Sequence, residues 1–332
     1  MGISASNGEG SGMFALWYVA RRHAELRPVA PVVPGAGEVM VRTLFSGISR
    51  GTERLVFNGL CRPRHNRRMC APMQEGTFPF PVKYGYCAVG VVEAGAADLV
   101  GRTVFALHPH QQLFTAPAVA VAVVPEAVPA RRAVLAANME TALNGVWDAG
   151  AGPGDRIVVV GAGVVGLLVT FLCAGLPGAE VTVVDTDPAR AEVARRLGAS
   201  FALPGRARGE ADVVIHASGT PAGLASALEL CGDEATLVEM SWYGDEAVSV
   251  HLGGEFHARR LRLVSSQVGQ VAASRRPRWE PARRLAKALA LLADPRLDDL
   301  ITGEVAFADL PAALPAILDE GAQGLMTAVR YQ

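Results

Sequence analysis

The sequence has few aromatic residues, almost no net charge and no long hydrophobic run. Aromatic residues make up 6% of the 332 positions, and the formal charge is −1 at pH 7. A balanced charge provides no electrostatic attraction toward nucleic acid or an anionic membrane surface. No apolar stretch reaches the roughly 20 residues that cross a bilayer. We therefore expect a small-molecule substrate as the partner, with no nucleic acid and no membrane involved.

Cysteine is also scarce. The five cysteines are odd in number and scattered, which favours reduced thiols over a disulfide framework. The first twelve residues, MGISASNGEGSG, lack the basic and apolar regions of a signal peptide. They are typical of a flexible leader over residues 1–12, and the missing signal predicts a cytoplasmic location. The length of the chain suggests two domains.

The most informative segment runs from residue 157 to residue 185. Its order is β-branched strand, glycine turn, apolar helix, second strand and acid, which is the order of a dinucleotide-binding unit. Gly161 permits the tight turn, Gly163 lets the backbone approach a pyrophosphate, and Gly166 lets helix and strand pack closely. The pyrophosphate would lie at the helix N-terminus. The predicted cofactor-binding residues of this turn are Gly161, Gly163, Val164, Val165 and Gly166.

Asp185 indicates which cofactor is bound. A carboxylate at the end of the second strand accepts hydrogen bonds from the adenosine ribose and repels a 2′-phosphate. The first basic residue after it is Arg190. We therefore predict NAD, with NADP as the alternative. FAD is less expected, because FAD-binding motifs of this kind usually begin a chain.

The remaining pattern predicts an α/β fold. Strands with Gly and Pro breakers are expected at residues 13–19, 38–45, 88–93, 103–107 and 119–124. A helical pattern covers residues 130–147. Beyond the glycine turn, strands at 181–184, 212–217, 235–240 and 260–265 alternate with helical segments, and helix 280–292 and strand 326–331 follow. This alternation predicts a doubly wound parallel sheet preceded by a β-rich domain.

Four segments resemble the medium-chain dehydrogenase/reductase superfamily over nearly the full chain. They are PGAGEVMVRTLFSGIS at 34–49, PVKYGYCAVGVVEAG at 81–95, METALNGVWDAGAGPGDRIVVVGAGVVG at 139–166 and ITGEVAFADLPAALPAILDEGAQGLMTAVRY at 301–331. The resemblance implies a GroES-like catalytic domain at 13–135 and 290–332, with a Rossmann domain at 136–289 inserted. SGISRGTE at 46–53 and YGY at 84–86 look most like the branch that contains bacteriochlorophyllide 2-hydroxyethyl dehydrogenase.

The resemblance also implies a homodimer. Members of the superfamily typically associate through an edge of the Rossmann sheet, and the strand at 260–265 is a plausible edge here. An unpaired apolar edge strand is an association site.

The zinc ligands of the superfamily are replaced in this chain. Ser49 stands where the first motif has Cys, and Tyr86 stands where the second motif has His. The third ligand should fall near Ala137, which has apolar neighbours. No cysteine lies between Cys87 and Cys173, so the quartet of the structural zinc is absent. Hydroxyls are poor zinc ligands beside thiolate and imidazole, and we expect no bound metal.

One other cluster is compatible with a metal. Cys61, His65 and Cys70 have the spacing C-x3-H-x4-C and would need one more ligand, such as His108 or His110. Five arginines between residues 54 and 68 oppose cation binding. A basic surface loop and a contact with an anionic substrate are the two other interpretations of this segment.

A zinc-free site needs other groups to polarise the substrate oxygen and to move a proton. The Tyr86 hydroxyl can donate, and Ser49 and Thr52 can relay a proton. Arg50 can bind a carboxylate or a developing oxyanion. His108, in the loop His108-Pro109-His110, titrates near neutrality. Structural alternatives exist: Tyr86 can simply fill the space of zinc, Arg50 can pair with Glu53, and Glu140 can cap a helix.

Further cofactor contacts are expected at strand ends, because ligands of open α/β sheets lie beyond the carboxyl ends of the strands. Thr141 matches a family Thr near the nicotinamide, and Trp242 is expected to wall the pocket. His216, inside an apolar strand, is interpreted as a core histidine. The predicted cofactor residues outside the glycine turn are Thr141, Asp185, Ser218, Gly219, Ser241 and Trp242.

The predicted function is that of a zinc-independent NAD(P)-dependent oxidoreductase. It would transfer a hydride between nicotinamide and a secondary alcohol or ketone of a small or ring-bearing molecule. One alternative is an enoyl or quinone reductase, since zinc-free relatives commonly reduce activated C=C bonds. A second alternative is a non-catalytic NAD(P)H-binding protein.

Overall fold

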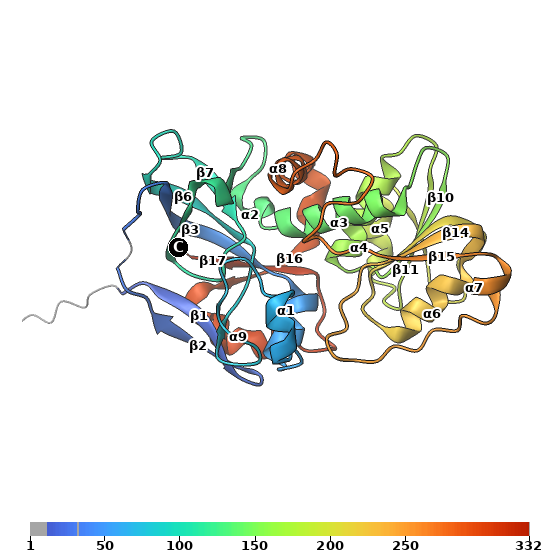
Figure 1. Cartoon of the computed structure of the whole chain (residues 1–332), viewed down its shortest axis with the longest axis horizontal. Helices are drawn as coiled ribbons and strands as arrows, with labels where there is room; N and C mark the ends of the chain where they lie inside the picture. The colour runs from blue at the N-terminus through green and yellow to red at the C-terminus, as the bar shows by residue number, and fades with distance from the viewer. Residues whose placement is uncertain (1–11, 32, 332) are drawn as a thin grey trace, which may run out of the picture.

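Three sheets organise the chain in the computed structural model, which describes residues 12–31 and 33–331. Two lie in a β-rich catalytic domain and the third forms a Rossmann domain beside it (Figure 1). The predicted leader lies outside the described residues except for Gly12. Among the described helices, none has the length and hydrophobicity to span a bilayer.

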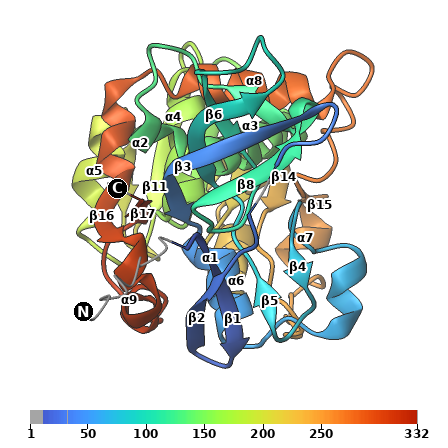
Figure 2. The ribbon, with the colours of Figure 1, turned by 90° about the vertical axis from the view of Figure 1, so that its left-hand side faces the viewer.

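The catalytic domain combines both ends of the chain. Its smaller sheet has the order β2 (His23–Pro28), β1 (Phe14–Ala20), β5 (Val82–Lys83) and β4 (Glu75–Gly76). Its larger sheet has the order β16 (Ile301–Ala306), β17 (Met326–Arg330), β3 (Glu38–Ile48), β6 (Ala88–Gly95), β7 (Thr103–Ala106) and β9 (Val121–Val123), with β8 (Leu113–Pro117) also paired to β3. The C-terminal strand β17 thus pairs antiparallel with β3, and Figure 2 shows the two sheets one above the other.

The Rossmann sheet is parallel throughout. Its order is β12 (Ser200–Ala202), β11 (Glu180–Val184), β10 (Arg156–Val160), β13 (Ala211–His216), β14 (Cys231–Glu239) and β15 (Arg262–Ser265). The strand order reverses at β10, where the glycine turn begins. Open α/β sheets bind their ligands at such a switch point.

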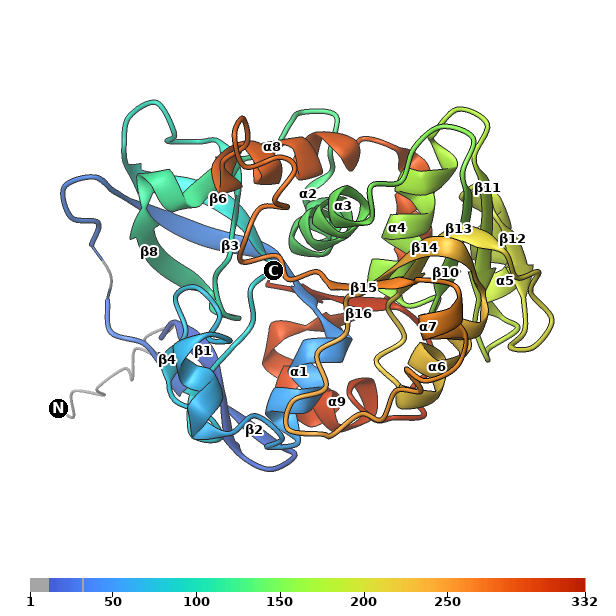
Figure 3. The same cartoon turned by 45° about the vertical axis from the view of Figure 1, so that its right-hand side comes forward.

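Helices cover both faces of this sheet (Figure 3). Along β10, Ile157 and Val159 pack with α3 (Ala136–Ala149) and α4 (Val164–Ala174), while Val158 and Val160 pack with α6 (Pro221–Glu229). Successive residues of a strand face opposite sides, so a continuous apolar run is what a doubly covered strand requires. The predicted α/β fold with a β-rich domain is confirmed.

The other helices connect the two domains or cover their edges. They are α1 (Arg50–Phe57), α2 (Ala130–Ala133), α5 (Arg190–Arg196), α7 (Glu255–Ala258), α8 (Pro281–Leu291) and α9 (Leu310–Ile317), with 3₁₀ turns at Pro63–Arg67, Ala118–Ala120, Pro295–Leu300 and Phe307–Asp309. The single helix predicted at 130–147 is therefore two helices, α2 and α3, joined at the buried residues Val134 and Leu135. The exact domain boundaries at 135/136 and 289/290 stay predictions.

Candidate active site

The glycine turn leads from β10 into α4. Gly161 has a φ of +107°, and a Cβ there would lie 2.6 Å from the Ser218 nitrogen. A Cβ on Gly166 would lie 1.8 Å from the Gly161 carbonyl oxygen. Neither position tolerates a side chain. Gly163 caps α4 and faces open space, so its backbone can be approached by a ligand.

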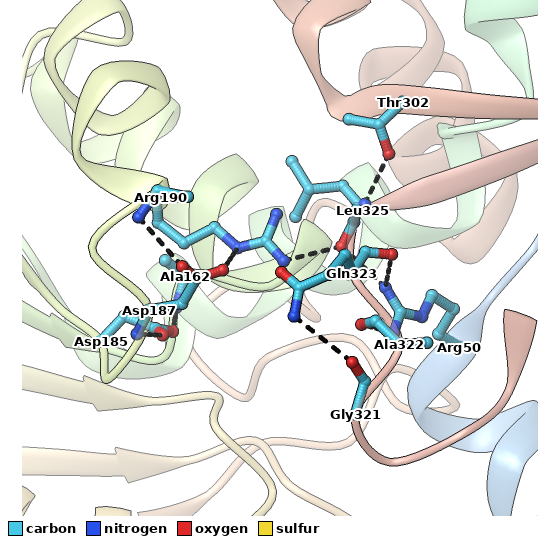
Figure 4. A network of polar contacts seen from close by, with 12 residues as sticks. Arg50, Ala162, Asp185, Asp187, Arg190, Thr302, Gly321, Ala322, Gln323 and Leu325 are labelled. Atoms are coloured by element: carbon cyan, nitrogen blue, oxygen red, sulfur yellow. Dashed lines mark hydrogen bonds and ion pairs between the residues drawn. The ribbon is translucent and has the colours of Figure 1, made fainter.

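Asp185 lies beside this turn, at the end of β11. Its carboxylate accepts hydrogen bonds from the Ala162 nitrogen at 2.6 Å and the Asp187 nitrogen at 2.8 Å (Figure 4). The side chain is half-buried. The acid is therefore fixed at the edge of the turn, where the sequence predicted contact with a ribose.

Two arginines from different domains meet on one backbone carbonyl. Arg50 from α1 and Arg190 from α5 each donate to the Gly324 oxygen at 2.7 Å (Figure 4). Arg50 also donates to the carbonyls of Ala322 and Gln323, and Arg190 lies 3.2 Å from Asp187. Burial, followed by the nearby charges of Arg54 and Arg190, lowers the pKa of Arg50. Arg50 thus holds the loop before β17 and does not pair with Glu53, and its predicted role toward a substrate stays a prediction.

Polar residues occupy the carboxyl ends of β13 and β14. His216 lies fully buried between Glu239 at 2.7 Å and the Ser218 hydroxyl at 2.6 Å. Burial alone would raise the pKa of Glu239, but the hydrogen bond and charge of His216 hold it below its ordinary value. The Ser241 hydroxyl accepts from the Gly219 nitrogen at 3.1 Å. Both serine hydroxyls are thus used within the protein, and His216 is a core histidine with three polar partners, Glu239, Ser218 and Ser241.

Trp242 connects the two domains. Its ring makes an edge contact with His65, with centroids 5.6 Å apart. His65 lies 3.2 Å from the Asp245 carboxylate, which also contacts Arg62 and Arg64. Trp242 and Tyr86 both pack against the core of the catalytic domain. The basic loop is therefore held against the segment after β14, at the joint where Trp242 was expected to wall the pocket.

Side-chain hydroxyls gather around Ser49 and Tyr86, the two positions that the resemblance matched to zinc ligands. Ser49 and Thr52 lie near Tyr86, where burial raises the pKa of the phenol and the side chains of Ser49 and Thr52 lower it. The Asn138 amide nitrogen donates to the Ser49 hydroxyl at 3.3 Å across the domain joint. Asn138 follows Ala137, the position expected for the third ligand, and was missed by the sequence argument. Burial raises the pKa of Tyr86 above its ordinary value, so its phenol stays protonated.

A buried carboxylate supports this cluster. Glu53, fully buried on α1, accepts from the Ser49 backbone nitrogen at 2.8 Å and the Tyr18 hydroxyl at 2.7 Å. His110 lies 3.0 Å from the same carboxylate and 2.7 Å from the Ser46 hydroxyl. These bonds compensate the desolvation of the carboxylate and fix the loop that carries Ser49. The motif SGISRGTE was the only sequence signal for Glu53.

The structure places His108, a predicted catalytic residue, in a buried position. Its ring stacks on Phe114 with centroids 3.7 Å apart, and its Nδ1 lies 2.9 Å from the Pro109 oxygen. Burial lowers its pKa to about 3, which favours the neutral ring and weighs against the predicted role. Its neighbour His110, two residues on, is the histidine that reaches the site through Glu53.

Glu140 and Thr141 lie on α3 near the joint. Glu140 pairs with the buried Arg284 of α8 at 3.0 Å and does not cap a helix. Burial raises the pKa of Glu140, and Arg284 opposes this effect. The Thr141 hydroxyl donates to the Ala137 carbonyl at 2.9 Å. Arg284 also donates to Asn144, and thereby joins α8 to α3 beneath Thr141.

Comparison with known proteins finds similar dehydrogenases. A family model described as zinc-binding dehydrogenase matches residues 164–288. D-guloside 3-dehydrogenase of Escherichia coli (strain K12) is 28% identical over 319 residues, covering 86% of this chain and 90% of that protein. The chain is thus similar to medium-chain zinc-binding dehydrogenases. These matches indicate an NAD(P)-dependent dehydrogenase rather than a non-catalytic NAD(P)H-binding protein.

Two solved structures share the fold of the dehydrogenase. An alcohol dehydrogenase of E. coli CFT073 complexed with NADH has a TM-score of 0.76 and 20% identity, covering 97% of this chain and 100% of its own. A zinc-binding dehydrogenase of Sinorhizobium meliloti 1021 bound to NADP has a TM-score of 0.77 and 18% identity, covering 97% and 100%. At this identity the likeness shows the fold alone, and NAD and NADP both occur among the neighbours.

The donors present in this chain do not fit the zinc site that the resemblance to zinc-binding dehydrogenases implies. Ser49, Tyr86 and Asn138 offer neutral oxygens and an amide where zinc requires thiolate, imidazole or carboxylate. In residues 12–31 and 33–331, no three His, Cys, Asp or Glu side chains are grouped to share a metal. Of the sequence-suggested cluster, Cys61 is buried, Cys70 is exposed and His65 is engaged by Asp245.

We predict that Gly163→Ala weakens cofactor binding without affecting the fold. The added methyl meets no protein atom within 4 Å but projects from the cap of α4. The Kd of NADH should rise at least about tenfold, which corresponds to ~1.4 kcal/mol, while Tm stays unchanged. Gly253→Ala, at another open glycine, is the matched control. Equal NADH affinity in both variants would show that the cofactor does not approach Gly163.

Proposed function

We propose that the protein oxidises a ring-borne secondary alcohol with NAD, and reduces the corresponding ketone, without zinc. The observation that carries this proposal is the group of Ser49, Thr52, Tyr86 and Asn138 at the place of the family's zinc site. Two independent hints support a ring-bearing substrate. The relative that matches 86% of this chain is named for D-guloside, and the motifs SGISRGTE and YGY resemble the bacteriochlorophyllide branch.

The chain's own residues then have distinct tasks. The nicotinamide, when bound, accepts or supplies the hydride. Tyr86, kept protonated by burial, donates a hydrogen bond to the substrate oxygen and, in the reducing direction, the proton that completes the alcohol. Ser49 and Thr52 lie near this phenol and relay a proton to it from solvent. Glu53 and His110 act through Ser49 as positioning residues.

The decisive experiment is a substrate panel with the variant Tyr86→Phe. Methyl glycosides, cyclic alcohols, ketones and enones are assayed with NAD or NADH at the nicotinamide absorbance. A ring alcohol or its ketone should react, and Tyr86→Phe should lower kcat about 100-fold, as expected when one donor to a reacting oxygen is lost. NADH affinity and Tm should be unchanged. Turnover within threefold of the parent would assign Tyr86 a space-filling role, and reaction of enones alone would favour the enoyl or quinone reductase.

We also predict that the purified protein contains no zinc. Hydroxyl and amide donors do not retain the metal, so elemental analysis of the purified protein should find well under one zinc per chain. Chelators should leave turnover unchanged. Stoichiometric zinc that is lost together with activity would contradict the proposal.

Cofactor preference is the third prediction, and it rests on Asp185. NADH should bind more tightly than NADPH because the carboxylate repels a 2′-phosphate. Asp185→Asn keeps an acceptor for the Ala162 nitrogen and removes the charge. It should therefore reduce the difference between the Kd values of NADH and NADPH while the turn stays intact. Asp187→Asn is the control for a nearby charge that does not reach the turn. NADPH binding about tenfold tighter than NADH in the parent would refute this role of Asp185.

Association through β15 is the fourth prediction. This strand ends the Rossmann sheet and carries Leu263, which is 39% exposed. A homodimer should be seen by light scattering at micromolar concentration, and Leu263→Lys should dissociate it. Leu203→Lys changes an exposed leucine just beyond β12, at the opposite edge of the same sheet, and should leave the dimer intact. A monomeric parent would refute the prediction.

A further inference from the structure

Asn138 has an unused acceptor at the site. Its side chain lies on the first turn of α3, and the residue is 5% exposed. The amide nitrogen donates to the Ser49 hydroxyl at 3.3 Å, whereas the amide oxygen is buried without any hydrogen-bond partner. Leaving such an acceptor buried and unpaired destabilises the protein, because the oxygen gives up its hydrogen bonds to water. A buried, unpartnered acceptor beside the reacting groups indicates that a ligand supplies the missing donor.

The chemistry of the site defines that donor. The hydroxyls of Ser49, Thr52 and Tyr86 can each donate or accept, so they serve an alcohol and a ketone equally. An amide oxygen only accepts, and it therefore requires an O–H or N–H group. The reacting oxygen loses its proton during oxidation, so it cannot be the lasting donor. A second hydroxyl of the substrate, next to the reacting one, meets this requirement.

The positions of the atoms agree with such a pair of hydroxyls. The Asn138 oxygen and nitrogen belong to one planar amide. The nitrogen donates a hydrogen bond to the Ser49 hydroxyl, and Ser49 lies near Tyr86. Tyr86 can therefore hydrogen-bond the reacting oxygen of the substrate while Asn138 accepts from the hydroxyl next to it. Ser49 precedes α1 of the catalytic domain and Asn138 lies on α3 of the Rossmann domain, so the contact lies where the two domains meet.

We propose that Asn138 is a specificity-determining residue whose side-chain oxygen accepts a hydrogen bond from a hydroxyl vicinal to the reacting one, so that the substrate is a vicinal diol. This inference rests on the proposed function, because it places the reacting oxygen at Tyr86. It narrows the substrate from a ring alcohol to a polyhydroxylated ring.

The test compares two probes that differ by one hydroxyl, cis-1,2-cyclohexanediol and cyclohexanol, on the parent and on Asn138→Leu. Leucine preserves the volume and removes the acceptor. The variant also loses the hydrogen bond to Ser49, which affects both probes, but the kcat/KM for the diol should fall about 10- to 100-fold further than that for cyclohexanol, mainly through KM. The Kd of NADH should stay within twofold. Asn138→Asp, which keeps an acceptor oxygen, should restore most of the diol activity, a rescue that a merely structural role would not produce.

The outcomes separate this inference from the proposed function. Two results overturn the role of Asn138 and leave the proposed function standing. One is an equal loss of kcat/KM on both probes in the variant. The other is a parent protein whose kcat/KM for cyclohexanol equals that for the diol. If the parent oxidises no ring alcohol, the proposed function fails. The role of Asn138 is then decided by saturation-transfer NMR of the diol with the NADH complex, and equal signals from parent and Asn138→Leu overturn it. Asn138→Ala replaces the leucine variant if that variant does not fold.

Discussion

The buried carboxylate of Glu53 is the interaction on which the candidate site depends. It joins three parts of the catalytic domain, namely β1 through Tyr18, the loop after β7 through His110, and the start of α1 through the Ser49 nitrogen. A carboxylate without solvent is stable only when such donors surround it, so removing one partner would leave an uncompensated charge. The same bonds decide where the Ser49 hydroxyl lies. The stability of this domain and the geometry of its chemistry are therefore linked through one residue.

Local patterns in the sequence predicted the Rossmann half well. The apolar run before Gly161 is buried on both faces as β10, and the acid 19 positions after Gly166 lies beside the turn. These features depend on contacts within one βαβ unit, where spacing along the chain fixes the geometry. The strand β2, with the sequence HAELRP, was missed because its charged residues are typical of an exposed hairpin and carry no core pattern.

The catalytic half was predicted less completely because its site is assembled from distant segments. Glu53 and His110 are 57 positions apart, and no local pattern pairs them. His108 and His110 look equivalent in sequence, yet one stacks on Phe114 in the core and the other meets Glu53. The third ligand position was placed near Ala137, and on a helix the next residue points about 100° away. A shift of one residue along α3, from Ala137 to Asn138, therefore replaces an apolar side chain with an amide at the site.

Replacement of the metal ligands changes what the site can recognise. A zinc ion draws in any oxygen with a lone pair, whether alcohol or carbonyl. A set of hydroxyls with one buried amide distinguishes donors from acceptors, because each unpaired group left behind costs free energy. The two arginines on the Gly324 carbonyl hold the C-terminal loop, and the Asn138 amide meets the Ser49 hydroxyl where α3 approaches the start of α1. In the proposed zinc-free site, selectivity would depend on the fit between these protein surfaces and not on a single Lewis acid. Such a pocket would gain specificity for a hydroxylated ring at the expense of polarising power, which Tyr86 would have to supply.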